Sequence, residues 1–131
     1  MDTNAHEPAI RVSMLPRDTN GHGTIFGGVL LAYIDQAGAI ATRRFCDLVV
    51  TVKMNEVVFH EPVYVGDVVS FYAKVVKIGT TSITVKVTVT AERWRKPGHV
   101  VKVTEAEVVY VNVGEDGRPA PIRKEPRVET A

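Results

Sequence analysis

Apolar and polar positions divide the chain into one dense apolar block near its start and several long β-branched segments after it. Between residues 28 and 44 the apolar positions fall on nearly every side of a helical turn, which predicts a helix over 28–44. A helix without an obvious solvent face has to be covered by the rest of the fold, so we expect it to be enclosed. The block is interrupted by Tyr33, Asp35 and Gln36 and falls short of the roughly 20 residues that a membrane span requires.

The remainder of the chain has the residue pattern of β-strands. We predict one short strand before the helix, over 10–15. Four longer strands follow the helix, and their predicted ranges are 49–59, 68–78, 82–95 and 99–113. Turn-forming residues separate these segments, so we expect neighbouring strands to be antiparallel.

Two of the predicted strands carry an informative alternation. From Ile83 to Ala91 apolar and polar residues alternate, which is typical of a strand with one covered face. In the last strand the alternation changes phase between Val103 and Ala106, as one extra residue near Glu105 would cause. This change predicts a β-bulge.

The order of the elements predicts the fold class. One helix followed by long antiparallel strands indicates an α+β fold, in which an antiparallel sheet wraps around one long central helix. We predict a single domain over 1–131, with its core at about 9–113. Residues 114–131 are rich in turn formers and poor in apolar anchors, so we expect an extended or mobile C-terminal tail.

Composition and charge narrow the function classes. The 131 residues include 16 basic and 15 acidic ones, and the formal net charge of +1 predicts no attraction to nucleic acid or to membranes. The single cysteine, Cys46, excludes an internal disulfide framework and fits a reducing compartment. Residues 1–7 lack the apolar stretch of a signal peptide, so we expect a cytoplasmic location.

Asp35 is the anomaly of the predicted helix, because its neighbours there are mostly apolar. Burying a carboxylate without partners costs several kcal/mol. One interpretation is a structural aspartate that is satisfied by backbone groups or by Gln36. The other interpretation is functional, since a desolvated carboxylate with few donors is a stronger general base or nucleophile.

Gly27 and Gly28 open the same helix. Without side chains they let a ligand approach the N–H groups at the positive end of the helix dipole, which would polarise a carbonyl oxygen. Tight packing between loop and helix explains the pair equally well. Asp35 lies about 10 Å along the axis from Gly28, too far for both to act on one carbonyl. If both act, they come from two subunits of an isologous dimer.

Two further polar segments are candidates. Asn20, in the loop before the helix, either makes a local turn with its own backbone or holds a water or a substrate oxygen opposite Asp35. A predicted hairpin turn beside Lys77 offers hydroxyl and N–H groups for a phosphate or an amide, although a solvated turn explains it as well. The residues of this turn are Gly79, Thr80, Thr81 and Ser82.

Some catalytic arrangements are absent from the sequence. No Gly-x-Ser-x-Gly motif is present, which excludes an enzyme of the α/β-hydrolase type. The four histidines are isolated, and no spacing suggests a metal site. Cys46 has no histidine near it in the sequence, so we interpret it as a core thiol.

Four stretches of the chain, which together cover about residues 14–122, resemble a known family. The family is that of the hotdog-fold acyl-CoA thioesterases, or acyl-CoA hydrolases, which includes YciA-like and brain acyl-CoA hydrolase-like enzymes. The stretches are DTNGHGTIFGGVLLAYIDQAGAIATR, VTVKMNEVVFHEPVYVGDVV, KIGTTSITVKV and TEAEVVYVNVGEDGRPAPI. The first is the most specific, because the loop asparagine, the glycine pair and the helix aspartate occur together at the family's spacing.

The resemblance implies both an architecture and a reaction. The active site is expected between two subunits, with a dimer as the minimal unit and a hexamer as a trimer of dimers. The implied reaction is hydrolysis of acyl-CoA to a free acid and CoA in fatty acid metabolism, with an aspartate as nucleophile or general base. CoA enters only as part of the substrate, and no cofactor or metal is implied. Acyl chain length and the choice between direct attack and activated water stay open.

The resemblance also assigns roles to residues. Asn20 and Asp35 match the catalytic pair, and Gly27 and Gly28 match the region that polarises the thioester carbonyl. The residues that look like parts of the CoA-binding groove are Lys53, Val57, Val58, Phe59, Gly79, Thr80, Thr81 and Ser82.

Two alternatives use different chemistry. A hotdog enoyl-CoA hydratase or dehydratase would need a histidine at position 23, after Asp18 and Asn20, but that position is Gly23 and His22 comes one residue early. A non-catalytic acyl-CoA-binding protein would use the same groove, and the complete set of Asn, Gly and Asp residues argues against it. Hydration of crotonyl-CoA without thiol release, or tight binding without turnover, would support these alternatives.

Overall fold

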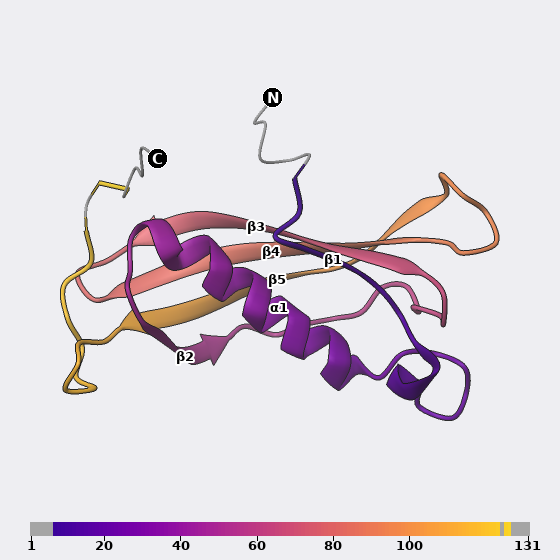
Figure 1. Ribbon diagram of the computed structural model, residues 1–131, viewed down its shortest axis with the longest axis horizontal. Coiled ribbons are helices and arrows are strands. Elements are labelled where there is room, and N and C mark those ends of the chain that lie inside the picture. Colours follow the sequence, from indigo (N-terminus) through magenta and orange to yellow (C-terminus); the bar gives the residue numbers. More distant parts are fainter. Residues whose placement is uncertain (1–6, 124, 127–131) are drawn as a thin grey trace.

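The computed structural model describes residues 7–123, 125 and 126. One helix packs on a five-stranded antiparallel sheet, which confirms the predicted α+β class (Figure 1). The strand order is β1-β3-β4-β5-β2. The elements are β1 (Ile10–Ser13), α1 (Gly27–Ala41), β2 (Val49–Met54), β3 (Val68–Ile78), β4 (Ser82–Glu92) and β5 (Val100–Asn112), with short 3-10 helices η2 (Pro16–Asp18) and η3 (Thr42–Arg44). None of the helices in this described part has the length and apolar character to cross a membrane.

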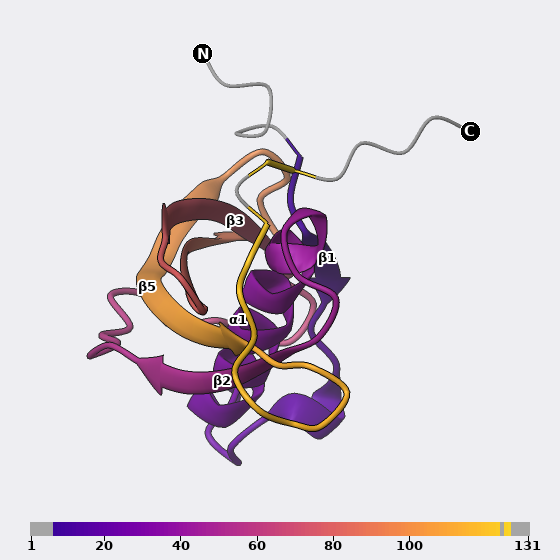
Figure 2. The ribbon, with the colours of Figure 1, turned by 90° about the vertical axis from the view of Figure 1, so that its left-hand side faces the viewer.

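The core lies between α1 and the concave face of the sheet, and Figure 2 shows the sheet curving around the helix. On β4 the alternating apolar residues from Ile83 to Ala91 are fully buried, so the predicted covered face is confirmed. From α1, Leu30, Ile34 and Ala37 enter this core. Burial of apolar surface on both elements holds the helix against the sheet.

Only one side of α1 is covered within a single chain. Ala32 and Gln36 are exposed, and Ile40 keeps 46% of its surface exposed. The expectation that the chain encloses the helix is therefore wrong. The physical reason is that one curved sheet covers part of a helix's circumference, and no second layer of this chain covers the rest.

Strand β2 is shorter than predicted, because it ends at Met54 and not at residue 59. The Asn55 side chain explains this end: its Oδ1 accepts a hydrogen bond from the Glu107 N–H at 2.8 Å, in place of a backbone carbonyl. The chain then follows β5 irregularly as far as His60, whose N–H donates to the Val103 carbonyl at 2.8 Å. The segment between Asn55 and His60 is thus anchored to the sheet without being a regular strand.

The predicted β-bulge lies in β5, opposite β4. Val89 pairs with Thr104, and the next residue, Thr90, pairs with Lys102, so Val103 is the extra residue. Val103 and Thr104 are both buried, which accounts for the change of phase in the alternation. The bulge is confirmed two residues before the expected position.

The segment after β5 turns back onto the body of the protein. Val113 forms a bridge with Pro119, and the Asn112 side-chain amide donates to the carbonyls of Ala120 and Pro121 at 3.0 and 3.2 Å. Ile122 is buried, and its N–H donates to the Thr80 carbonyl at 2.9 Å. This part of the predicted tail packs on the body of the protein, and Ile122 is its apolar anchor. Residues 124 and 127–131 of the predicted tail lie outside the described residues.

Candidate active site

Asp35 lies on α1 beside strands β2 and β5. Its carboxylate oxygen Oδ1 accepts a hydrogen bond from the Thr51 hydroxyl at 2.7 Å. Its backbone carbonyl accepts one from the Tyr110 hydroxyl at 2.6 Å. Thr51 and Tyr110 are direct partners in the β2–β5 ladder, so two facing residues of the sheet hold one helix residue at two points.

Asp35 is half-buried, which corrects the expectation of an aspartate buried on a helix without a solvent face. The exposed side of α1 begins next to it, at Gln36. Thr51 is the described residue that donates a well-formed hydrogen bond to this carboxylate, and the Tyr110 hydroxyl lies close to the carboxylate as well. One oxygen is therefore oriented by Thr51, and the other is available to a substrate or a water.

Tyr110 and Gly38 form a close contact behind Asp35. Tyr110 is only 1% exposed, and a Cβ added at Gly38 would overlap its hydroxyl. Burial raises the pKa of Tyr110, and the nearby Asp35 carboxylate raises it further, so the phenol stays a neutral donor. Neither residue stands out in the sequence as a candidate for the site. A glycine inside a helix costs about 1 kcal/mol relative to alanine. Its presence at position 38 was therefore the one sequence signal that another group packs closely against the helix there.

The glycine pair lies at the start of α1. Val29 and Leu30 both donate their N–H groups to the Phe26 carbonyl, at 3.1 and 3.4 Å. The N–H groups of Gly27 and Gly28 have no acceptor in the described part of the chain, as expected for the first residues of a helix. These two groups can donate to a substrate oxygen.

Phe59 packs against the same helix start. A Cβ added at Gly27 would lie 3.3 Å from Cε2 of the Phe59 ring, so a glycine at this position leaves room for the ring. Phe59 itself is 38% exposed. The structure thus brings together Gly27 and Phe59, which the sequence analysis had assigned to the carbonyl-polarising region and to the CoA groove.

Asn20 makes the local turn that was one of its two interpretations. Its Oδ1 accepts from the His22 N–H at 2.9 Å, and its Nδ2 donates to the Thr24 hydroxyl at 2.7 Å. A side-chain amide has two N–H donors, so a second one stays available for a ligand. The turn places Asn20 before the start of α1, away from Asp35 of the same chain.

The predicted CoA-binding residues separate into two groups. Lys53, on β2, is exposed. Val57, Val58 and Phe59 follow β2 towards the start of α1, and Val58 accepts a hydrogen bond from Thr104 at 2.6 Å through its carbonyl.

The second group is the β3–β4 turn, which lies towards the C-terminal end of α1 (Figure 1). Gly79 donates to the Ser82 carbonyl at 2.7 Å and closes the turn. The Thr80 and Thr81 carbonyls accept from Ile122 and Asn112, at 2.9 and 2.8 Å. A single chain therefore does not bring the two groups into one groove, nor does it bring Asp35 to the start of its own helix.

A single helix packed into a curved antiparallel sheet is the fold that this chain shares with a solved hotdog-fold thioesterase. The model of the Thioesterase superfamily matches residues 22–97. The chain belongs to this superfamily.

Individual relatives are similar over almost the whole chain. The acyl-CoA thioester hydrolase YciA of Salmonella typhimurium is 41% identical over 124 residues, which are 92% of this chain and 93% of the relative. The crystal structure of a hexameric hotdog fold thioesterase of Campylobacter jejuni has a TM-score of 0.85 and 48% identity, over 90% of this chain and 91% of that chain. An acyl-CoA hydrolase from Staphylococcus aureus, solved with butyryl coenzyme A and coenzyme A, has a TM-score of 0.79 and 30% identity, over 87% and 70%.

Proposed function

We propose that this chain hydrolyses acyl-CoA thioesters to a free carboxylic acid and CoA. The observation that carries the proposal is the Asp35 carboxylate, which Thr51 orients through one oxygen and leaves open at the other. The name of the Salmonella relative and the butyryl coenzyme A complex of the Staphylococcus relative support this substrate class. The proposed reaction requires no metal and no redox cofactor.

Asp35 acts as the base or the nucleophile in this proposal. As a nucleophile, Oδ2 attacks the thioester carbonyl, the C–S bond breaks with loss of the CoA thiolate, and water hydrolyses the resulting anhydride. As a base, Asp35 takes a proton from a water that attacks the same carbon. In both routes the N–H groups of Gly27 and Gly28 stabilise the negative charge that develops on the carbonyl oxygen.

Two chains complete one site in this proposal. Asp35 is about 10 Å along the helix from Gly28, so the glycine pair and Asn20 of a second chain supply the oxyanion donors. The exposed side of α1 and the edge strand β2, where Val50 and Val52 are 45% and 54% exposed, offer apolar surface for such a contact. The Campylobacter relative is hexameric, and we infer a trimer of dimers for this chain.

The same pairing explains the two separated groups of predicted CoA-binding residues. The group at Lys53 and Val57–Phe59 lies towards the start of α1, and the turn at Gly79–Ser82 lies towards its end. In a dimer with antiparallel central helices, the Lys53 and Val57–Phe59 group of each chain lies next to the Gly79–Ser82 turn of its partner. We propose that CoA binds along this shared groove.

The test compares Asp35→Asn with the wild type. Asparagine keeps an oxygen that can accept from Thr51, so the variant should fold, while it loses the base and nucleophile. Thiol release from a panel of acyl-CoAs of different chain lengths is expected to fall at least about 100-fold. Asp116→Asn, in an exposed turn after β5, is the matched control and should keep full turnover. Unimpaired turnover in Asp35→Asn would reject the proposed role.

A further inference from the structure

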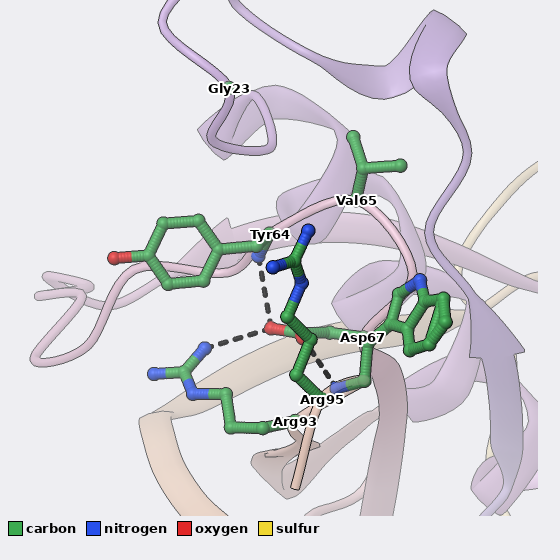
Figure 3. Close-up of a pocket in the computed structure, with 7 residues that line it drawn as sticks. Gly23, Tyr64, Val65, Asp67, Arg93 and Arg95 are labelled. Atoms are coloured by element: carbon green, nitrogen blue, oxygen red, sulfur yellow. Dashed lines mark hydrogen bonds and ion pairs between the residues drawn. The ribbon is translucent and has the colours of Figure 1, made fainter.

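A pocket of about 440 Å³ lies between the loop before α1, the turn that precedes β3 and the segment that follows β4 (Figure 3). None of the residues Asp35, Thr51 and Tyr110 lines it. Its volume is within the range of about 300–1,000 Å³ that is usual for small-molecule sites. The pocket is therefore separate from the site around Asp35 and large enough for a small molecule.

The floor of this pocket is a fixed ion pair. Asp67 is 2% exposed and accepts from the backbone N–H groups of Tyr64 at 3.0 Å and Trp94 at 3.2 Å. Arg93 donates to the Asp67 carboxylate and to the Pro62 carbonyl, each at 2.8 Å. Glu61 lies 3.7 Å from the same guanidinium, so Asp67 and Glu61 compensate the Arg93 charge and hold its guanidinium in place.

Arg95 supplies a positive charge that is not compensated. Its side chain lines the pocket beside Tyr64 and extends towards Gly23 (Figure 3). No described residue accepts a hydrogen bond from it or forms an ion pair with it. Asp67 and Glu61 both pair with Arg93, whereas Arg95 is the lining cation without a carboxylate partner among the described residues.

Two exposed aromatic side chains border this charge. Trp94 is 62% exposed and Tyr64 is 44% exposed. Trp94 is positioned against Gly66, where an added Cβ would overlap the indole ring, and the backbone at Gly66 has a φ of 88°. The Arg93 guanidinium carbon lies 5.1 Å from the centroid of the Tyr64 ring. Aromatic faces stack on planar rings such as bases, and guanidinium groups beside them bind phosphate.

We propose that this pocket binds a phosphorylated nucleotide, with the base on the aromatic side chains of Tyr64 and Trp94 and a phosphate on Arg95. This chemistry is shared by the nucleotide end of CoA and by free nucleotides. For the first source the inference rests on the proposed hydrolase function, and for the second it does not.

The pocket is connected to the predicted catalytic loop. Tyr64 forms a bridge with Thr24, and the Thr24 hydroxyl accepts from Asn20 at 2.7 Å. Gly23, which lines the pocket, precedes Thr24 in the same loop. A nucleotide in the pocket thus borders the loop that holds Asn20, so it affects the orientation of that amide.

Fluorescence tests this site directly, because Trp94 is the only tryptophan of the chain. The full chain is titrated with CoA, adenosine 3′,5′-bisphosphate, ADP and, as the phosphate-free control, adenosine. The phosphorylated ligands should change the Trp94 emission saturably, and adenosine should bind at least about tenfold more weakly. Arg95→Gln should weaken the binding of the phosphorylated ligands by about tenfold or more, whereas the exposed neighbour variant Lys96→Gln should not.

The outcomes separate the two sources and the two proposals. Tighter binding of CoA and the bisphosphate than of ADP identifies the nucleotide end of CoA, and equal or tighter binding of ADP identifies a free nucleotide. No saturable change with any phosphorylated ligand, or unchanged affinity in Arg95→Gln, overturns the inference. Asp35→Asn should bind the bisphosphate like the wild type, so a failure of the hydrolase proposal would not be confused with a failure of this one.

Discussion

The hydroxyl of Thr51, on β2, donates a hydrogen bond of 2.7 Å to the Asp35 carboxylate, on α1. This bond fixes one carboxylate oxygen and thereby the direction of the other. It spans 16 residues of sequence and forms because β2 passes beside the middle of the helix. Thr51 is thus a positioning residue for the proposed reaction, and its role can be separated from that of Asp35.

Thr51→Val removes the donor and keeps the shape of the side chain. We expect kcat to fall about 10- to 100-fold with little change in KM, since the oriented carboxylate acts in the chemical step and not in binding. Thr51→Ser keeps the hydroxyl and should restore most of kcat. Steady-state kinetics with one acyl-CoA measure both variants. An equal loss of kcat in the Ser and Val variants would show that the Thr51 hydroxyl does not orient the carboxylate for the reaction.

Tyr110 and Gly38 should be energetically coupled. Gly38→Ala ordinarily stabilises a helix by about 1 kcal/mol, but here the added Cβ overlaps the Tyr110 hydroxyl, so we expect a net loss of about 1–3 kcal/mol. Tyr110→Phe alone should cost about 1 kcal/mol, because it removes the hydrogen bond to the Asp35 carbonyl. The double variant should be more stable than the sum of the two losses predicts. Urea unfolding gives the free energy of unfolding of the wild type, the two single variants and the double variant. Additive losses would show that the two side chains do not interact.

The buried pair of Asp67 and Arg93 should contribute strongly to stability. Asp67→Ala leaves two backbone N–H groups without their acceptor and the largely buried Arg93 guanidinium without its nearer carboxylate, so we expect the free energy of unfolding to fall by about 3–5 kcal/mol. Glu105→Gln, in an exposed cluster with Lys86 and Lys102, is the control and should cost about 1 kcal/mol or less. Urea unfolding curves compare the two. Similar small losses of unfolding free energy in both variants would show that the buried pair of Asp67 and Arg93 does not stabilise the fold.

Cys46 should make stability fall at alkaline pH. Burial raises the pKa of this thiol above its ordinary value of 9.0, so the unfolded chain loses the proton at a lower pH than the folded one. The contribution is fully present below about pH 9 and is lost as pH rises through the folded pKa. Urea unfolding between about pH 8 and 10 should show a steeper decline in the wild type than in Cys46→Ala. Parallel declines would show that another group is responsible.

Several parts of the fold could be predicted from the chain because they depend on local patterns. The period of two from Ile83 to Ala91 identified the covered face of β4, and the phase change after Val103 identified the bulge in β5. The apolar block identified α1 to within a few residues at each end. Each of these features follows from side-chain direction along one element, which sequence spacing contains.

The surroundings of Asp35 depend on contacts that sequence spacing does not contain. Thr51 and Tyr110 are 16 and 75 residues away, and they meet Asp35 because the β2–β5 register sets them opposite each other below the helix. The same register places the Tyr110 hydroxyl so close to α1 that position 38 has room only for a glycine. The half-exposure of Asp35 follows from the curvature of the sheet, which covers one side of α1 only. The residue types along the chain were therefore enough to single out Asp35 as a candidate, whereas strand pairing and sheet curvature set its hydrogen-bond donor and its exposure.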